Sequence, residues 1–282
     1  MVMAAFSAVS VKLISWLLSV IFLPLSGLTL GVDLISASSR TDYSKSNVAG
    51  IGAYFRSQGV TTDGEYLYFS CKTALIRTDM SGKIADKANL AAIPDELKDE
   101  YGTAHIGGIS FYDGKIYAGM EDSKVWDNPI VGVFDCETLQ LEKYYMLDGE
   151  KITRGLPWVS VDPETGYLYC TDHAKKPALL LSYDISGDMA PVGETPIAGA
   201  LPSVQGAEFL NGVLYCATDD DTQAIYTVDP VGGEVNKVID RNLTKGSEGE
   251  GMTFVERGGK TVILAIDLGP LFVNAFIREY NI

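Results

Sequence analysis

Residues that could transfer protons or bind a cation recur at the ends of short apolar segments in this sequence. Only two histidines are present, His105 and His173. Imidazole gains and loses a proton near neutral pH, so either residue could act as a general acid or base. Neighbouring carboxylates would supply the oxygen ligands that Ca²⁺ prefers. The acidic residues at segment ends are Glu121, Asp122, Asp172, Asp219, Asp220, Asp221, Glu248, Glu250 and Asp267.

These residues belong to a unit that recurs along the chain. Its clearest copy, Val204–Asp219, reads as a strand entered through a glycine, a turn at Asn211-Gly212, and a second strand that ends in acidic residues. Five copies align by their second strands about every fifty residues. The aligned column holds Tyr68, Tyr117, Tyr169, Tyr215 and Ile263. A period of roughly 40 to 50 residues, with several strands in each unit, is typical of the blades of a β-propeller.

Each copy continues into a third strand, and the first four copies continue into a fourth. Four-stranded blades close around a central channel. The fifth copy stops after its third strand, so an N-terminal segment is expected to supply the missing edge strand, and Val32–Ser38 is the predicted donor. The sequence therefore predicts an all-β fold, a propeller of five four-stranded blades closed by the N-terminus. Six blades would need residues 39–56 to form most of another blade, and that segment is too short.

The first 31 residues differ from the rest of the chain. Leu13–Leu23 has the length of a secretory signal core and is followed by Pro24 and small residues. Leu13–Val32 also holds 20 residues without a charge, which is enough to span a bilayer. We expect residues 1–31 to be a signal peptide of a secreted protein, with a retained membrane anchor as the alternative. Residues 32–282 are expected to form one extracytoplasmic domain.

The net charge of the chain limits the kinds of molecule that it is expected to bind. The chain carries 22 basic and 37 acidic residues, a formal net charge of −15, which disfavours nucleic acids and anionic membrane surfaces. We expect a monomer that binds a small molecule, with membrane contact only if the N-terminal segment is retained. The four cysteines permit two disulfides, and packing as small apolar residues explains them equally well.

Side-chain alternation along the innermost strand indicates which residues face the channel. One column consists of Thr61, Ser110, Ser160, Glu208 and Thr253. Glu208 is the only charged residue in this column. It is either a ligand for a cation or a solvated acid held by the neighbouring hydroxyl groups.

The first two strands of a blade are antiparallel, so the start of one and the end of the other lie on the same face of the propeller. Both histidines and the acidic residues named above belong to this face. Gln58 and Gln205 precede inner strands and are predicted to contact a ligand there. Trp158 and Trp126 would offer stacking surfaces, with packing between blades as the alternative.

The repeat plan resembles the secreted propellers of the SMP-30/gluconolactonase, strictosidine-synthase-like and NHL-type group over Val32–Ile282. Hydrolases of that group hold one divalent cation on the axis through a glutamate that opens an inner strand. The stretch Glu248-Gly249-Glu250-Gly251 is similar to such an opening. The resemblance therefore implies that Glu250 is a metal ligand.

Two functions are compatible with this sequence. The first is a metal-dependent hydrolase of a lactone or related ester, in which His105 or His173 transfers protons. Its calcium ion would be held by Glu208, Glu250 and Asp219. The second is a non-catalytic propeller that binds a glycan, a peptide or a small ligand on the same face. Metal analysis followed by a lactone and ester panel would separate the two.

Overall fold

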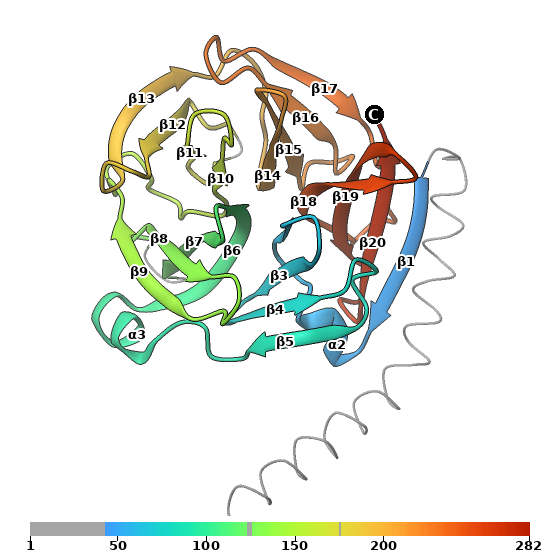
Figure 1. Ribbon diagram of the computed structural model, residues 1–282. Coiled ribbons are helices and arrows are strands. Elements are labelled where there is room, and N and C mark those ends of the chain that lie inside the picture. Colours follow the sequence, from blue (N-terminus) through green and yellow to red (C-terminus); the bar gives the residue numbers. More distant parts are fainter. Residues whose placement is uncertain (1–42, 123–125, 175) are drawn as a thin grey trace, which may run out of the picture.

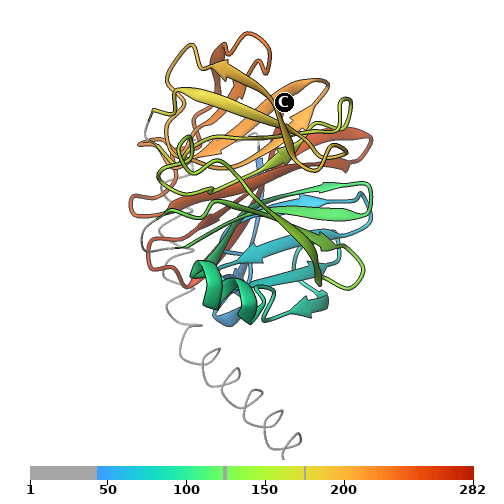
Figure 2. The same cartoon turned by 90° about the vertical axis from the view of Figure 1, so that its left-hand side faces the viewer.

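The computed structural model describes residues 43–122, 126–174 and 176–282. These residues form five four-stranded antiparallel sheets arranged radially around a common axis (Figure 1). Within these ranges two short helices accompany the sheets, α2 (Ile51–Tyr54) and α3 (Asp95–Tyr101). Helix α3 lies at the outer edge of the ring in both Figure 1 and Figure 2. The predicted five-bladed all-β propeller is therefore confirmed.

The blades follow one another along the chain, and within each blade the strand order runs from the axis outwards. Blade 1 contains β2 (Val60–Thr62), β3 (Leu67–Cys71), β4 (Ala74–Thr78) and β5 (Ala85–Asn89). Blade 2 contains β6 (Thr103–Tyr112), β7 (Lys115–Asp122), β8 (Ile130–Asp135) and β9 (Leu141–Met146). Blade 3 contains β10 (Ser160–Val161), β11 (Tyr167–Cys170), β12 (Leu179–Asp184) and β13 (Ala190–Pro196). Blade 4 contains β14 (Val204–Leu210), β15 (Val213–Thr218), β16 (Ile225–Val228) and β17 (Val235–Ile239). Blade 5 contains β18 (Glu248–Arg257), β19 (Lys260–Leu268), β20 (Asn274–Asn281) and β1 (Tyr43–Ala49).

Ring closure by an N-terminal strand is confirmed, but the predicted donor is wrong. The edge of β20 is occupied by β1, which pairs with it over seven residues, whereas Val32–Ser38 lies outside the described residues. Residues 43–49 are nearer in sequence to the inner strand β2, so the connecting loop is shorter and its closure costs less entropy. The Tyr43 ring also packs on the Tyr280 ring, with centroids 5.6 Å apart.

The repeated tyrosine column packs one blade against the next. The second strand of a blade places its tyrosine against the inner strand of the following blade. In three interfaces the partner is a phenylalanine, with ring centroids 5.0 to 6.1 Å apart: Tyr68–Phe111, Tyr169–Phe209 and Tyr215–Phe254. Tilted, edge-on and offset rings at this distance are the favoured aromatic arrangements. The sequence repeat is therefore a repeat of inter-blade contacts.

The predicted hairpin turn is confirmed. Asn211 and Gly212 connect β14 to β15 with φ values of 52° and 73°, the positive pair that a two-residue hairpin turn requires. Helix α3 begins after Pro94 and ends at Gly102, whose φ of 69° is typical of a residue that follows a helix.

All four cysteines are unbonded and buried, so they serve as packing residues. In the part of the chain that the structure describes, no helix is both long enough and apolar enough to cross a membrane. The predicted leader, residues 1–31, lies outside this part, and export stays a prediction.

Candidate functional site

The inner strands approach one another most closely at a collar of glycines. A Cβ atom added at Gly206 would lie 2.6 Å from the Cα of Gly251, and one added at Gly251 would lie 2.8 Å from the Cα of Gly59. Gly108 of blade 2 even approaches the Gln205 carbonyl of blade 4, two blades away. Only glycine permits such backbone proximity. The collar narrows the central channel and divides the polar residues along it into two groups.

One group lies at the end of the axis where the inner strands begin, and we call this group the upper mouth. It consists of Gln58, His105, Glu121, Asp219, Glu248 and Glu250. Irregular strand pairing places two of these side chains. The register of β18 on β19 shifts between Gly249 and Met252, which sets Glu250 in a β-bulge. A similar shift in β6 lies on each side of His105 and Ile106. Bulges re-aim side chains and are frequent beside functional sites.

A hydrogen-bonded chain crosses three blades at the upper mouth. Glu121 Oε1 lies 3.1 Å from His105 Nδ1, and the two residues are cross-strand partners in blade 2. His105 Nε2 lies 2.8 Å from Gln58 Oε1 of blade 1. Gln58 Nε2 donates to Glu250 Oε1 of blade 5 over 3.4 Å. Polar side chains from blades 2, 1 and 5 are thereby held in one arrangement.

Neighbouring side chains hold the His105 ring from both sides. Gln58 Nε2 donates to the Ser57 carbonyl over 2.6 Å, which orients the amide so that its oxygen faces the imidazole. Both ring nitrogens of His105 therefore face acceptor oxygens, one from Glu121 and one from Gln58.

Glu121 has an unsatisfied oxygen. Glu121 is 4% exposed, and its Oε2 has no hydrogen-bond partner among the described residues. A Cβ added at Gly155, where φ is 98°, would lie 2.1 Å from this oxygen. An unpaired buried carboxylate oxygen is costly, and Gly155 leaves the room that this oxygen occupies.

The other carboxylates of the upper mouth repel one another. Burial raises the pKa of Glu250 well above its ordinary value, and the charges of Glu248 and Asp219 raise it further. Burial also raises the pKa of Glu248, with a further increase from Asp219. Burial raises the pKa of Asp219 as well, although the Gly249 N–H and Arg241 oppose this. All three groups would gain from a nearby positive charge.

Arg241 provides part of the positive charge that acts on Asp219 and Glu250. It is 1% exposed, and its guanidinium donates to the backbone carbonyls of Gln223, Thr218 and Ile266 at 2.5 to 3.5 Å. Asp267, predicted on the same face, instead forms a buried ion pair with Arg278 at 2.6 Å. Sequence reasoning missed Arg241, since a single arginine in a loop between repeats gives no motif.

The remaining predicted residues differ in their access to ligand. His173 is half-buried, and its charge lowers the pKa of Asp219, so it lies near the upper mouth. Gln205 is half-buried at the collar, and Trp126 is half-buried beside Gly155. Trp158 is fully buried and donates from Nε1 to Thr171 Oγ1 over 3.2 Å, so it packs between blades and has no surface for stacking.

Glu208 lies on the other side of the collar. Its carboxylate accepts hydrogen bonds at 3.1 to 3.4 Å from the hydroxyl groups of Thr61, Ser110, Ser160 and Thr253. The predicted channel column is thus confirmed. The three predicted metal ligands are divided between the two ends of the axis. Over the described ranges no group of three or more His, Cys, Asp or Glu side chains is placed to hold a metal ion. The residues do not fit the predicted calcium site as a set, and calcium binding stays a prediction.

A cavity of about 590 Å³ adjoins the upper mouth at Asp219. Its lining includes Ser203, Asp221, Thr222 and Lys237, and the Lys237 ammonium forms an ion pair with Asp240 at 2.9 Å. Asp220 also lines it but has a structural role, accepting hydrogen bonds from the Ala224 N–H and the Tyr226 hydroxyl. Burial acts to raise the pKa of Asp220, and these hydrogen bonds outweigh it and lower the pKa. The cavity therefore presents Asp219 and Asp221 to a ligand, beside a lysine that is already paired with Asp240.

Comparison with known proteins gives no family. No protein-family model and no curated protein matches the sequence. Among solved structures, the chain is similar to Kuenenia stuttgartiensis hydrazine synthase, with 14% identity and a TM-score of 0.45, over 76% of this chain and 57% of that chain. It is similar to a chain of the mitotic checkpoint complex, with 10% identity and a TM-score of 0.41, over 79% and 74%. It is also similar to Saccharomyces cerevisiae Sqt1, with 11% identity and a TM-score of 0.41, over 78% and 57%. The chain spans little more than half of two of these, and its function must be argued from its own residues.

Proposed function

We propose that the protein is a binding module that recognises a ligand with a positively charged, N–H-bearing nitrogen at the upper mouth. The observation that carries this proposal is a convergence of carboxylates that exceeds the local positive charge. The carboxylates are Glu121, Glu248, Glu250 and Asp219, and the opposing groups are Arg241, His105 and His173.

Electrostatic attraction between a ligand cation and these carboxylates would contribute to binding. Two unit charges 4 Å apart interact by about 4 kcal/mol at an effective dielectric constant of 20. A ligand cation beside Glu248 and Asp219 would replace mutual repulsion by attraction. It would also favour the ionised forms of both groups, whose pKa values burial and repulsion raise.

The unfilled acceptors indicate the chemistry of that cation. Glu248 and Asp219 are half-buried, so each carboxylate is partly open to a ligand. A guanidinium or primary ammonium group supplies several N–H donors together with the charge. The adjoining cavity of about 590 Å³ has the size of a small-molecule site, for which roughly 300 to 1,000 Å³ is typical. A small diamine, a guanidino compound or a basic peptide side chain fits both features.

Isothermal titration calorimetry with agmatine and putrescine tests this proposal, with 1,4-butanediol as the uncharged control. We expect both amines to bind and the diol not to bind. Glu248→Gln and Asp219→Asn keep side-chain size and remove charge, so each should weaken amine binding at least tenfold. Glu256→Gln, an exposed residue at the far end of β18, is the matched control and should bind as the wild type does. Absence of amine binding to the folded wild type would refute the proposal.

Hydrolysis of a lactone or related ester is a second candidate, favoured by the Glu121–His105 pair. A carboxylate that orients an imidazole is the arrangement of a general base. In this site His105 Nε2 is held by Gln58, so a substrate would have to displace that amide. A lactone and ester panel, assayed with and without divalent cations, tests the activity. Turnover that is lost in His105→Gln would support it, and no turnover of any substrate would exclude hydrolysis of that class.

A further inference from the structure

The opposite end of the axis carries a second cavity, of about 160 Å³, below the glycine collar. We call it the floor cavity. Its lining residues include Glu208, Phe111, Phe209, Phe254, Thr62 and Thr253. Drug-sized ligands need roughly 300 to 1,000 Å³, so this space matches one small chemical group.

Hydrogen-bond directions show that Glu208 acts as an acceptor. Thr61 Oγ1 accepts from the Phe111 N–H over 2.9 Å, and Ser110 Oγ accepts from the Val161 N–H over 3.1 Å. Each hydroxyl group is thus left to donate its proton to Glu208. Such an arrangement is complementary to an ionised carboxylate.

That carboxylate has no cationic partner in the described part of the chain. Its side-chain contacts are hydroxyl groups, which are neutral. Its surroundings are dehydrated enough for burial to be the main influence on its proton affinity. A partly buried anion without a countercharge is unfavourable, and a bound cation would compensate it.

Three aromatic rings line the same cavity, and each is held by the preceding blade. Phe111, Phe209 and Phe254 come from blades 2, 4 and 5. Each packs on a tyrosine of the blade before it, so its position is set by the fold. Aromatic rings attract cations through their quadrupoles, most strongly where water is excluded. Rings that are already in place lose little entropy when a ligand binds.

We propose that the floor cavity binds a quaternary ammonium group, such as the trimethylammonium head of a choline-like molecule. Each oxygen of Glu208 already accepts two hydroxyl donors, Oε2 from Thr61 and Thr253 and Oε1 from Ser110 and Ser160. No acceptor position is therefore vacant for an N–H group. A cation without N–H donors gains the charge attraction and the ring contacts and leaves no donor unpaired.

The experiment titrates the full chain with choline and with 3,3-dimethyl-1-butanol, the neutral carbon analogue of choline. Binding is followed by calorimetry and by NMR shifts of the phenylalanine rings. We expect choline and tetramethylammonium to bind, methylammonium to bind more weakly, and the neutral analogue to bind at least tenfold more weakly than choline. Equal binding of the neutral analogue, or no binding of choline, would overturn the proposal.

Variants locate the site. Glu208→Gln should weaken choline binding at least tenfold. Phe254→Leu keeps an apolar side chain without the ring and should weaken choline binding about threefold or more. If Glu208→Gln does not fold, choline binding by Phe254→Leu tests the site instead. Glu248→Gln at the upper mouth is the matched control and should bind choline unchanged, although it is expected to lose amine binding. Choline binding that is lost in Glu248→Gln and retained in folded Glu208→Gln or Phe254→Leu would place the site elsewhere and refute the assignment.

Discussion

Glu208 shows how one carboxylate can join a whole ring. It belongs to blade 4, and its four hydroxyl donors come from blades 1, 2, 3 and 5. All five blades therefore meet at a single side chain. This position is poorly hydrated, which destabilises the ionised carboxylate. Burial accordingly raises the pKa of Glu208 to about 7 from an ordinary value of 4.5.

This shift predicts how Glu208 contributes to the pH dependence of stability. Between pH 4.5 and 7 the unfolded chain has lost the Glu208 proton that the folded chain still binds. The contribution of Glu208 to the free energy of unfolding should therefore fall as pH rises through this window and then level off. The fall should be about 3 kcal/mol, since one pKa unit corresponds to 1.36 kcal/mol. The hydrogen-bond donors to Glu208 are the four hydroxyl groups and the Phe209 N–H, and its cross-strand partner is Tyr215. All of these groups are uncharged in this pH range, so no neighbouring charge offsets the effect of burial.

Urea unfolding at pH 5 and pH 8 measures this effect. Glu208→Gln has no titrating group and should lose less stability than the wild type between the two values. Glu250, Glu248 and Asp219 also have raised pKa values, and their common effect cancels in the comparison. Equal losses in the two proteins would show that Glu208 does not titrate in this window.

Gly155 is a second residue whose role is testable. In Gly155→Ala the added Cβ would meet Glu121 Oε2, and the backbone would keep a φ of 98° that side chains disfavour. Displacing Glu121 should also break its contact with His105. We expect a loss of about 2 to 4 kcal/mol in the free energy of unfolding, from the strained backbone and the clash together. Gly64→Ala is the control, because its φ is 91° and nothing lies within 4 Å of the added atom. Equal losses in the two variants would mean that the contact with Glu121 is unimportant.

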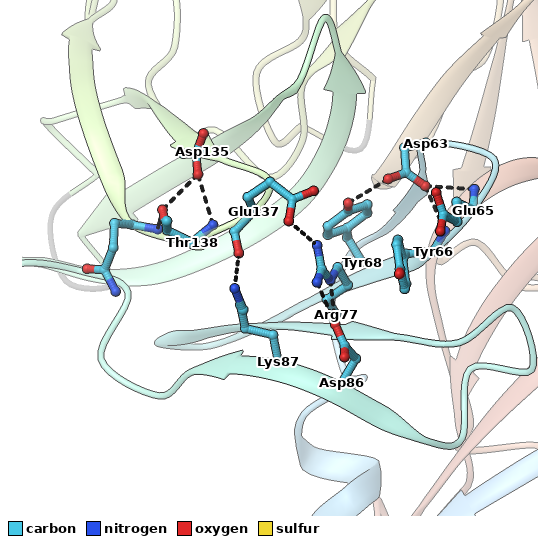
Figure 3. Close-up of polar contacts among 11 residues, drawn as sticks. Asp63, Glu65, Tyr66, Tyr68, Arg77, Asp86, Lys87, Asp135, Glu137 and Thr138 are labelled. Atoms are coloured by element: carbon cyan, nitrogen blue, oxygen red, sulfur yellow. Dashed lines mark hydrogen bonds and ion pairs between the residues drawn. The ribbon is translucent and has the colours of Figure 1, made fainter.

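At the scale of elements, the first two blades are connected by a polar network at their outer strands (Figure 3). Arg77 of β4 donates to Asp86 of β5 at 2.6 Å and to Glu137, in the turn between β8 and β9, at 2.9 Å. Its guanidinium lies 4.3 Å from the centre of the Tyr66 ring. One planar group therefore joins two strands of blade 1 to blade 2.

Arg77→Lys should weaken this connection, because an ammonium group cannot make the forked contacts or the planar stacking of arginine. We expect a loss of about 1 to 2 kcal/mol in the free energy of unfolding, measured by urea denaturation. Glu137→Gln should cost less than about 1 kcal/mol, because the Glu137 side chain is 68% exposed and its ion pair is screened by solvent. A larger loss from Glu137→Gln than from Arg77→Lys would assign the connection to the ion pair instead of to the guanidinium.

At the scale of the whole molecule, the two ends of the axis are separate sites because the collar lies between them. This separation bears on the predicted calcium ion. A ligand that binds only the folded chain raises the free energy of unfolding by about 2.7 kcal/mol at 100 times its dissociation constant. For a chain of this size that corresponds to roughly 2 to 4 °C in Tm per kcal/mol.

Thermal unfolding with added ligands compares calcium with an amine. We expect agmatine to raise Tm by several degrees and Ca²⁺ at the same concentration to raise it less, since the described carboxylates form no metal-holding group. Magnesium and sodium at matched ionic strength control for screening. A calcium shift larger than the agmatine shift, and lost in Glu250→Gln, would favour the metal site predicted from the sequence.

Much of the architecture is present in the sequence because it is local or repeated. The tyrosine column shows the period of the blades, the Asn211-Gly212 pair specifies a hairpin turn, and alternation places Glu208 and its hydroxyl donors on the channel wall. Each of these follows from strand geometry and neighbouring residues within one repeat. The residues of the upper mouth could likewise be assigned to one face, since strand direction alone decides that.

Contacts between repeats could be decided only by the tertiary structure. A repeat pattern predicts which side chains of each strand face the channel. It does not predict how closely strands of different blades approach one another. The glycine collar therefore separates Glu208 from Glu250 although the sequence places them in adjacent blades. Packing between blades buries Trp158 completely, and Tyr43–Ala49 pairs with the free edge of β20 and closes the ring. These outcomes depend on backbone distances across the axis and at the ring closure, which no single repeat encodes.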